Sequence, residues 1–125
     1  MPVFLTQEQV AQLHRRSLEL YGGQDGLRDR ALFEGAVAQP QQVFAYEGGD
    51  SFELAAAYCF HIAQAQAFID GNKRTAVAAG LVFLNLNGVS TNRPITDRLY
   101  AAMIAIAERK IGRRELASLL RELLA

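Results

Sequence analysis

Residues 67–76 read Ala67-Phe68-Ile69-Asp70-Gly71-Asn72-Lys73-Arg74-Thr75-Ala76, and the rest of the chain is organised around them. An apolar run that reads as a helix precedes this stretch, from about Phe52 to Ala65. A second apolar helix is predicted from Lys73 to about Asn87. The stretch is therefore a short loop that runs into a helix N-terminus, where unpaired backbone N–H groups and the helix dipole favour anions.

The side chains of this stretch carry the chemistry. Lys73 and Arg74 add positive charge at the helix N-terminus. Asp70 adds an oxygen that could either cap the helix or hold a divalent cation. These groups predict a phosphate-binding site with a metal option. The competing interpretation is a capped helix whose cations point into water, because solvated charges are common.

Length and composition limit the class of protein. A chain of 125 residues fits one domain, residues 1–125, and half of its residues are hydrophobic, which is enough for a core. The formal net charge is zero, which argues against a broad nucleic-acid interface. The single cysteine, Cys59, cannot form an internal disulfide and favours a reducing compartment.

No targeting segment or membrane span is expected. The N-terminal apolar residues are too few for a signal peptide and lack a basic region before them. The longer apolar stretches are interrupted by polar residues within the length of one span. We therefore expect a cytoplasmic protein that contacts neither a membrane nor nucleic acid directly.

Helix signals dominate the N-terminal half. Thr6 and Gln9 have the spacing of a capping box, and the helix that they begin should end near Tyr21, before a pair of glycines. Asp29 can cap a second helix, which Pro40 is expected to stop or kink, with another short turn or helix at 41–47. Asp50 or Ser51 then caps the helix that leads to the motif.

The C-terminal half continues in the same way. Thr96 is expected to cap a helix that ends near Lys110, and a last helix should run from Arg113 to Leu124. No stretch alternates well enough to predict a strand. The fold class is therefore all-α, a compact single-domain bundle of about six helices with mostly short connections.

The two histidines, His14 and His61, are interpreted as structural residues. His14 lies beside Leu13 on an apolar face, so a buried or half-buried ring bonded to a backbone group is expected. His61 is expected to be a packed, hydrogen-bonded core residue. It lies five positions before Gln66, and that spacing does not place the two on one helix face.

The order Phe68-x-Asp70-Gly71-Asn72-Lys73-Arg74 resembles the central motif of the Fic/Doc family, which is His-x-Phe-x-(Asp/Glu)-(Gly/Ala)-Asn-(Lys/Gly)-Arg. Lys73 stands where Fic-type adenylyl transferases usually carry glycine, so the chain looks closest to the Doc branch. This branch holds the death-on-curing toxins of toxin–antitoxin pairs. The resemblance also includes a Leu-His and Tyr-Gly-Gly opening, covers nearly the whole chain and implies the Fic fold. Gln66 occupies the position of the family's histidine.

The resemblance implies a kinase that moves the γ-phosphate of ATP to a threonine of elongation factor Tu and so blocks translation. Asp70 would hold Mg²⁺. The nucleotide phosphates would be bound by Asn72, Lys73 and Arg74, with the backbone N–H groups of the Gly71 turn. Phe68 would fix the loop by packing. The implied partner is a small Phd-like antitoxin whose C-terminal helix folds into a groove of the toxin.

Gln66 removes the general base that this chemistry uses. Histidine can accept a hydroxyl proton near neutral pH, whereas glutamine can only donate or accept a hydrogen bond. General-base help is worth about 10²–10⁴-fold in rate. We therefore expect a chain that folds and binds nucleotide but transfers phosphate poorly. Two histories could explain Gln66. An engineered or selected change that makes a toxin safe to express is favoured over a natural variant that works as an inactive partner-binding protein.

Three other interpretations stay open. One is an adenylyl transferase, against which Lys73 weighs. Another is a non-catalytic module that binds an antitoxin or regulates its operon. The last is a plain helical domain with no phosphate site. A P-loop and a zinc site are excluded, because the required glycine, cysteine and histidine spacings are missing.

Overall fold

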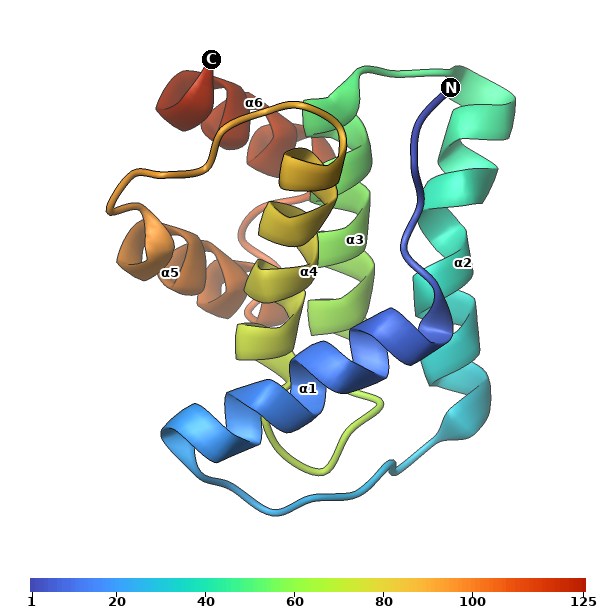
Figure 1. Ribbon diagram of the computed structural model, residues 1–125, viewed down its shortest axis with the longest axis vertical. Helices are drawn as coiled ribbons and strands as arrows, with labels where there is room; N and C mark the ends of the chain where they lie inside the picture. The colour runs from blue at the N-terminus through green and yellow to red at the C-terminus, as the bar shows by residue number, and fades with distance from the viewer.

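The computed structural model describes residues 1–125 and contains six α-helices (Figure 1). They are α1 (Gln7–Tyr21), α2 (Arg30–Glu47), α3 (Ser51–Ala65), α4 (Asn72–Leu86), α5 (Thr96–Ala107) and α6 (Arg113–Leu124). Extended backbone is paired only once, in an isolated bridge between Leu27 and Phe68. The all-α prediction of about six helices is confirmed.

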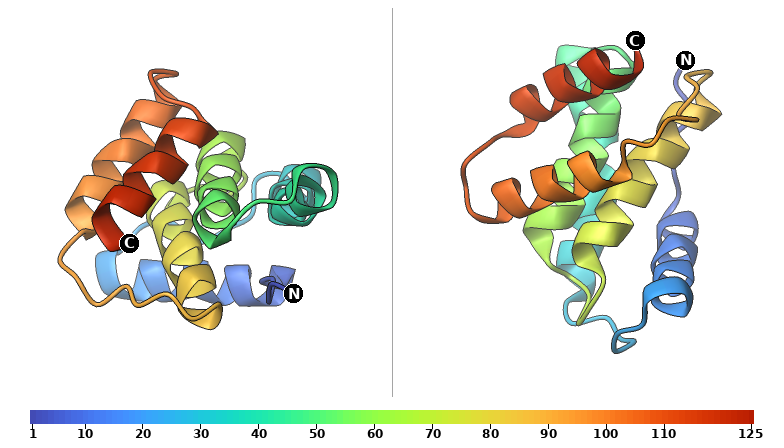
Figure 2. Two further views of the ribbon diagram at one scale, coloured as in Figure 1. Left: turned by 90° about the horizontal axis from the view of Figure 1, so that it is seen from above. Right: turned by 90° about the vertical axis from the view of Figure 1, so that its left-hand side faces the viewer.

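Helix α3 is the centre of the bundle. It packs against α2, α4, α5 and α6, while α1 crosses one end of the bundle and packs mainly on α4 (Figures 1 and 2). This position follows from its sequence, because six consecutive residues from Leu54 to Cys59 are buried and the helix has no polar face along this segment. A helix that is apolar all round is stable only when other helices surround it.

Helices α3 and α4 approach each other closely at Gly80. A Cβ atom at position 80 would lie 2.2 Å from the Sγ atom of Cys59 and 3.3 Å from the carbonyl oxygen of Ala55. The contact requires glycine, because no side chain fits between the two helices at this point. It fixes how α4 lies on α3, and so it fixes where the N-terminus of α4 lies.

The predicted helix starts in the N-terminal half are confirmed. The Thr6 hydroxyl accepts the Gln9 N–H at 3.1 Å, and the Gln9 side chain accepts the Thr6 N–H at 2.8 Å. Asp29 caps α2, and Asp50, rather than Ser51, caps α3. These signals can be read from the sequence because each cap involves neighbours along the chain.

The expected stop at Pro40 and the separate short helix at 41–47 are wrong, and a kink at Pro40 stays a prediction. Pro40 neither stops α2 nor separates a second short helix, because the chain stays helical through to Glu47 and Pro40 is buried inside it. The apolar face that includes Val37 and Val43 packs against α3 along its length, and this packing outweighs the loss of one N–H donor.

Helix α5 also differs from the expectation at both ends. Ile95, not Thr96, is the capping residue, and no side chain caps the helix. The helix ends at Ala107, before Lys110, because Arg109 takes a left-handed backbone with φ 61°. The Lys110 N–H then donates to the Ala105 carbonyl at 2.8 Å and closes the turn. None of the six helices combines the length and the apolar character needed to cross a membrane.

Candidate functional site

Two loops from opposite halves of the sequence lie against each other. They are the α3–α4 loop, residues 66–71, and the α1–α2 loop, residues 22–29. The Ile69 N–H donates to the Gly26 carbonyl at 3.0 Å, and the Arg28 N–H donates to the Ala67 carbonyl at 2.7 Å. The motif loop is therefore held in place by backbone hydrogen bonds from a segment about forty residues earlier in the chain.

Gln66 stands at the point where α3 ends. Its backbone is left-handed, with φ 49° and ψ 45°, and its carbonyl accepts a hydrogen bond from the guanidinium of Arg28. Its side chain is exposed and lines the pocket described below. The residue at the family's histidine position thus faces the pocket, but its carboxamide cannot act as a base at neutral pH.

Phe68 packs the motif loop against the core. The Phe68 ring is 5% exposed and stacks on the His14 ring, with the centroids 3.7 Å apart and the planes 9° apart. His14 is buried, and its Nε2 atom lies 2.7 Å from the Asp70 carbonyl oxygen. Because a carbonyl can only accept, Nε2 carries the proton. The expectation of a buried His14 bonded to a backbone group is confirmed.

Asp70 does not cap α4, which corrects one of the two options drawn from the sequence. The capping residue is Gly71, with φ 84° and no side-chain cap, and the Asp70 carboxylate instead accepts the Gln24 N–H at 2.8 Å. The other carboxylate oxygen makes no hydrogen bond in the protein. No three or more His, Cys, Asp or Glu side chains are placed so that they could hold a metal ion together. Mg²⁺ is commonly held by one or two carboxylates together with substrate phosphates, so one free oxygen fits that use.

Asn72 organises the loop with its side chain. Its Oδ1 atom accepts the Phe68 N–H at 3.0 Å, and its Nδ2 atom donates to the Phe68 carbonyl at 2.9 Å. The carboxamide is thus satisfied within the protein. What Asn72 offers to the pocket is its backbone N–H.

The N-terminus of α4 presents unpaired donors. The first N–H near it that bonds within the protein is that of Thr75, which donates to the Gly71 carbonyl at 3.0 Å. The N–H groups of Asn72, Lys73 and Arg74 have no acceptor in the protein. Three such donors at the positive end of a helix dipole form an anion site.

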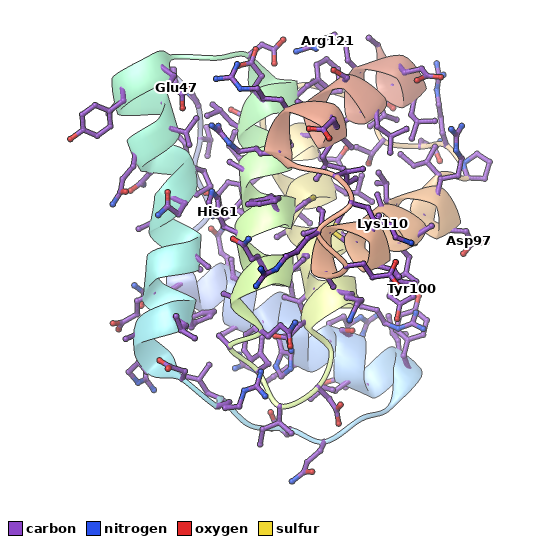
Figure 3. All side chains as sticks on the ribbon, turned by 180° about the vertical axis from the view of Figure 1, so that it is seen from behind. Glu47, His61, Asp97, Tyr100, Lys110 and Arg121 are labelled. Atoms are coloured by element: carbon purple, nitrogen blue, oxygen red, sulfur yellow. The ribbon has the colours of Figure 1, made fainter.

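Two unneutralised cations stand beside these donors. Lys73 is half-buried, Arg74 is exposed, and neither forms an ion pair. The Arg74 guanidinium lies over two aromatic rings, 4.0 Å from the centroid of Tyr21 and 4.9 Å from that of Tyr100. The sequence alone assigns neither tyrosine to the site, because they come from α1 and α5 and only the fold brings them to the motif. Figure 3 shows Tyr100 on α5, on the side of the bundle where α1 ends.

These groups surround a pocket of about 440 Å³, which we call the motif pocket. Its lining residues are Ser17, Tyr21, Gly22, Gly23, Gln66, Ile69, Asp70, Gly71, Asn72, Lys73, Arg74 and Tyr100. Every predicted site residue except the buried Phe68 lines it. The pocket therefore combines a carboxylate, two cations and free backbone donors, which is a set suited to a polyphosphate and a divalent cation.

A second hollow, which we call the apolar groove, adjoins the motif pocket. It has a volume of about 300 Å³ and seven of its twelve lining residues are hydrophobic, among them Leu13, Leu20, Val77 and Leu81. It lies between α1, α4 and α5. Arg74 and the two tyrosines line both hollows, so they form the wall that separates them.

His61 lies away from the motif pocket, as expected for a non-catalytic residue. It is half-buried on α3 and lines a different hollow against α2 (Figure 3). Its ring makes an edge contact with Phe60 but no hydrogen bond, so the expectation of a hydrogen-bonded ring is wrong. Burial, with a contribution from the positive charge of Arg113, lowers the pKa of His61 to about 4. The ring is therefore uncharged at neutral pH.

Comparison with known proteins gives consistent matches. The model of the Fic/DOC family matches residues 4–84. The protein kinase doc of Escherichia phage P1 is 37% identical over 86 residues, which are 68% of each chain. The toxin Doc of Mycolicibacterium smegmatis is 42% identical over 73 residues, which are 55% of each chain. The family match contains both loops of the motif pocket, whereas Tyr100 lies beyond it.

Proposed function

The chain belongs to the Fic/DOC family, and from this premise we propose that it is a Doc-type toxin of a toxin–antitoxin pair, built for phosphoryl transfer from ATP to a protein hydroxyl. One observation carries the proposal. Three unpaired N–H groups, two unneutralised cations and a carboxylate converge on one pocket. A relative that bears the name protein kinase supports the reaction class.

The nucleotide phosphates would be bound at the N-terminus of α4. The backbone N–H groups of residues 72–74 would donate to phosphate oxygens, and Lys73 and Arg74 would supply positive charge. The free oxygen of Asp70 would hold Mg²⁺, which neutralises phosphate charge when it is bound. Phosphoryl transfer depends mainly on such positioning and charge stabilisation.

The proposed acceptor is a threonine hydroxyl of elongation factor Tu, whose phosphorylation would block translation. Gln66 faces the pocket where the hydroxyl would approach. Its carboxamide can orient that hydroxyl by a hydrogen bond but cannot take its proton. We therefore propose that this chain binds ATP and transfers phosphate about 10²–10⁴-fold more slowly than a chain with histidine at position 66.

The proposed partner is a Phd-like antitoxin whose C-terminal helix lies in the apolar groove. Two observations support this placement. The groove offers an apolar surface between α1, α4 and α5, with Leu20 60% exposed, and amphipathic helices bind in such grooves. It also shares a wall with the motif pocket, so a helix in the groove would lie beside the Arg74 guanidinium.

The test compares ATP labelled at the α- and at the γ-phosphate, with Mg²⁺, elongation factor Tu and the Gln66→His chain. We expect transfer of the γ-label, much weaker transfer by the native chain, and none after Asp70→Ala is added. Gln66→Asn is the matched control, because it changes the side chain without adding a base. Toxicity in cells that lack the antitoxin should follow the same order.

The other outcomes separate the rival functions. Transfer of the α-label would identify an adenylyl transferase. A folded Gln66→His chain that binds ATP but labels nothing would indicate a non-catalytic binding module. A folded chain that binds neither ATP nor Mg²⁺ would leave a plain helical domain.

A further inference from the structure

Arg74 is held in an unusual way for an arginine at a phosphate site, and we infer that Tyr21 and Tyr100 are its positioning residues. Together the two rings form what we call the tyrosine clamp. The clamp fixes the guanidinium at the mouth of the motif pocket while leaving its charge available to an anion. The inference rests on the proposed function, because a phosphate in the pocket is the group that the fixed charge would meet.

The clamp and the arginine that it holds come from three helices. Tyr21 is the last residue of α1, Arg74 lies in the first turn of α4, and Tyr100 lies in α5. The two distances from the guanidinium carbon to the ring centroids, 4.0 and 4.9 Å, are both within the range of about 6 Å for cation–π contacts. Contacts from two separate helices restrict the positions that the side chain can take more than a contact from one helix would.

Aromatic rings hold a guanidinium differently from a carboxylate. A carboxylate bonds to the N–H groups and cancels the charge, whereas a ring contacts the flat face and leaves the N–H donors in the plane free. An exposed arginine otherwise keeps much rotamer freedom, which a ligand has to restrict on binding. The clamp restricts it beforehand, so the anion meets a preorganised donor.

The neighbouring cations show that this arrangement is particular to Arg74. Lys73, the preceding residue, has no aromatic partner. Arg121 is the other arginine near a ring, 5.7 Å from the centroid of Phe52, but it is neutralised by Asp50 at 2.8 Å and Glu53 at 3.6 Å. Arg74 alone combines aromatic contacts with the absence of a carboxylate partner, and it faces the motif pocket.

The experiment measures binding of inorganic pyrophosphate and of ATP with Mg²⁺ by calorimetry on the full chain. Tyr21→Leu and Tyr100→Leu remove the ring, whereas Tyr21→Phe and Tyr100→Phe keep it. We expect each leucine change to weaken pyrophosphate binding about 2- to 5-fold, in line with exposed cation–π contacts, and each phenylalanine change to leave it within about 2-fold.

A thermodynamic cycle then separates positioning from general damage. In an Arg74→Ala background the leucine changes should have no further effect, because nothing remains for the rings to hold. Lys73→Ala is the matched control, and its effect should add to that of the leucine changes. If the leucine changes weaken pyrophosphate binding equally in the Arg74→Ala background, the inference is overturned. That result would show that the tyrosines contact the ligand directly.

A ligand-free measurement covers the possibility that a leucine variant folds poorly. Ring currents should shift the NMR signals of the Arg74 side chain in the native and phenylalanine chains, and each single leucine variant should lose part of that shift. Unshifted Arg74 signals in the native chain would overturn the clamp. So would leucine variants that bind pyrophosphate as tightly as the native chain while Arg74→Ala does not.

The same measurements distinguish failure of the clamp from failure of the kinase proposal. Binding of pyrophosphate that depends on the clamp, without binding of ATP, would contradict the kinase proposal and support the clamp. Binding of ATP that the leucine changes do not weaken would contradict the clamp and support the kinase proposal. Absence of binding for both ligands in the native chain would contradict both.

Discussion

The carboxamide of Asn72 is joined to the backbone of Phe68 by two hydrogen bonds, one to its N–H and one to its carbonyl. Both residues belong to the motif, so one motif residue helps to hold the backbone of another in place. Phe68 is in turn stacked on His14, which bonds to the Asp70 carbonyl. The loop between α3 and α4 is therefore held by contacts within the protein, without a ligand.

Replacing Asn72 tests this scaffold. Asn72→Ala leaves the Phe68 N–H and carbonyl without partners in a partly buried position, which should cost about 1–3 kcal/mol of unfolding free energy. ATP binding should also weaken, although the Asn72 carboxamide is bonded to the Phe68 backbone. Urea unfolding and calorimetry measure the two effects. Asn92→Ala is the control, because that exposed side chain makes no hydrogen bond. An unchanged free energy of unfolding would contradict the scaffold role.

Gln66 should be replaceable at little cost to folding. Its left-handed backbone costs an ordinary residue about 1–2 kcal/mol, which glycine avoids, while glycine itself costs about 0.5–1 kcal/mol in chain entropy. We expect Gln66→Gly to raise the free energy of unfolding by up to about 1 kcal/mol. Gln66→His should stay within about 0.5 kcal/mol of the native chain, because the side chain is exposed. Strong destabilisation by glycine would show that the Gln66 side chain supports the fold.

The contact between α3 and α4 should not tolerate a methyl group. Gly80→Ala would place Cβ 2.2 Å from the Cys59 sulfur, and the overpacking should cost about 1–3 kcal/mol. Adding Cys59→Ala removes the sulfur and should recover most of the loss. Gly35→Ala on α2 is the matched control, since a Cβ there meets no atom within 4 Å, and it should be neutral or slightly stabilising. Equal thermal melting points for the two alanine variants would be incompatible with this contact.

Acid should destabilise the fold through His61. Its pKa is lowered from 6.5 to about 4, by burial first and by Arg113 second. Between these values the unfolded chain binds a proton that the folded chain does not, so stability falls as pH falls from 6.5 to 4. Urea midpoints measured from pH 7 to pH 4 should show this slope, and His61→Gln should flatten it.

A separate loss of folding stability is expected below pH 4, and it serves as the internal control. Burial raises the pKa of Asp50, but hydrogen bonds from the Glu53 N–H and Arg121 outweigh it and lower the pKa below 3.8. Asp50 therefore contributes stability above this value and loses it in stronger acid. His61→Gln should keep that loss. An unchanged slope between pH 6.5 and pH 4 in this variant would exclude His61 as the source.

The sequence predicted the features that depend on near neighbours. The caps at Thr6 and Asp29, and the loop that enters α4, each involve residues a few positions apart. The stop expected at Pro40 is absent because α2 packs against α3 on both sides of it. The cap expected at Thr96 is absent because α5 begins one residue earlier in the chain, with Ile95 at the capping position. Local preference is a weak guide where tertiary contacts are extensive.

The difference between near-neighbour and long-range contacts also explains which parts of the site the sequence did not predict. The motif itself was visible, but the groups that hold it come from far along the chain. His14 bonds to a residue 56 positions away, Arg28 to one 38 positions away, and the Gln24 N–H to one 46 positions away. The contact of Tyr100 with Arg74 likewise exists only once α5 has packed on α4.

The place of Tyr100 in the chain sets the order in which the site is completed during synthesis. All other residues that line the motif pocket lie at or before position 74, and Tyr21 is made early. At about 5–20 residues per second, the ribosome adds the last ring roughly 1–5 s after the arginine that it grips. During that interval the rest of α4 is still being made, and the second ring of the clamp is missing. Tyr100 is thus the last residue of the pocket to be synthesised.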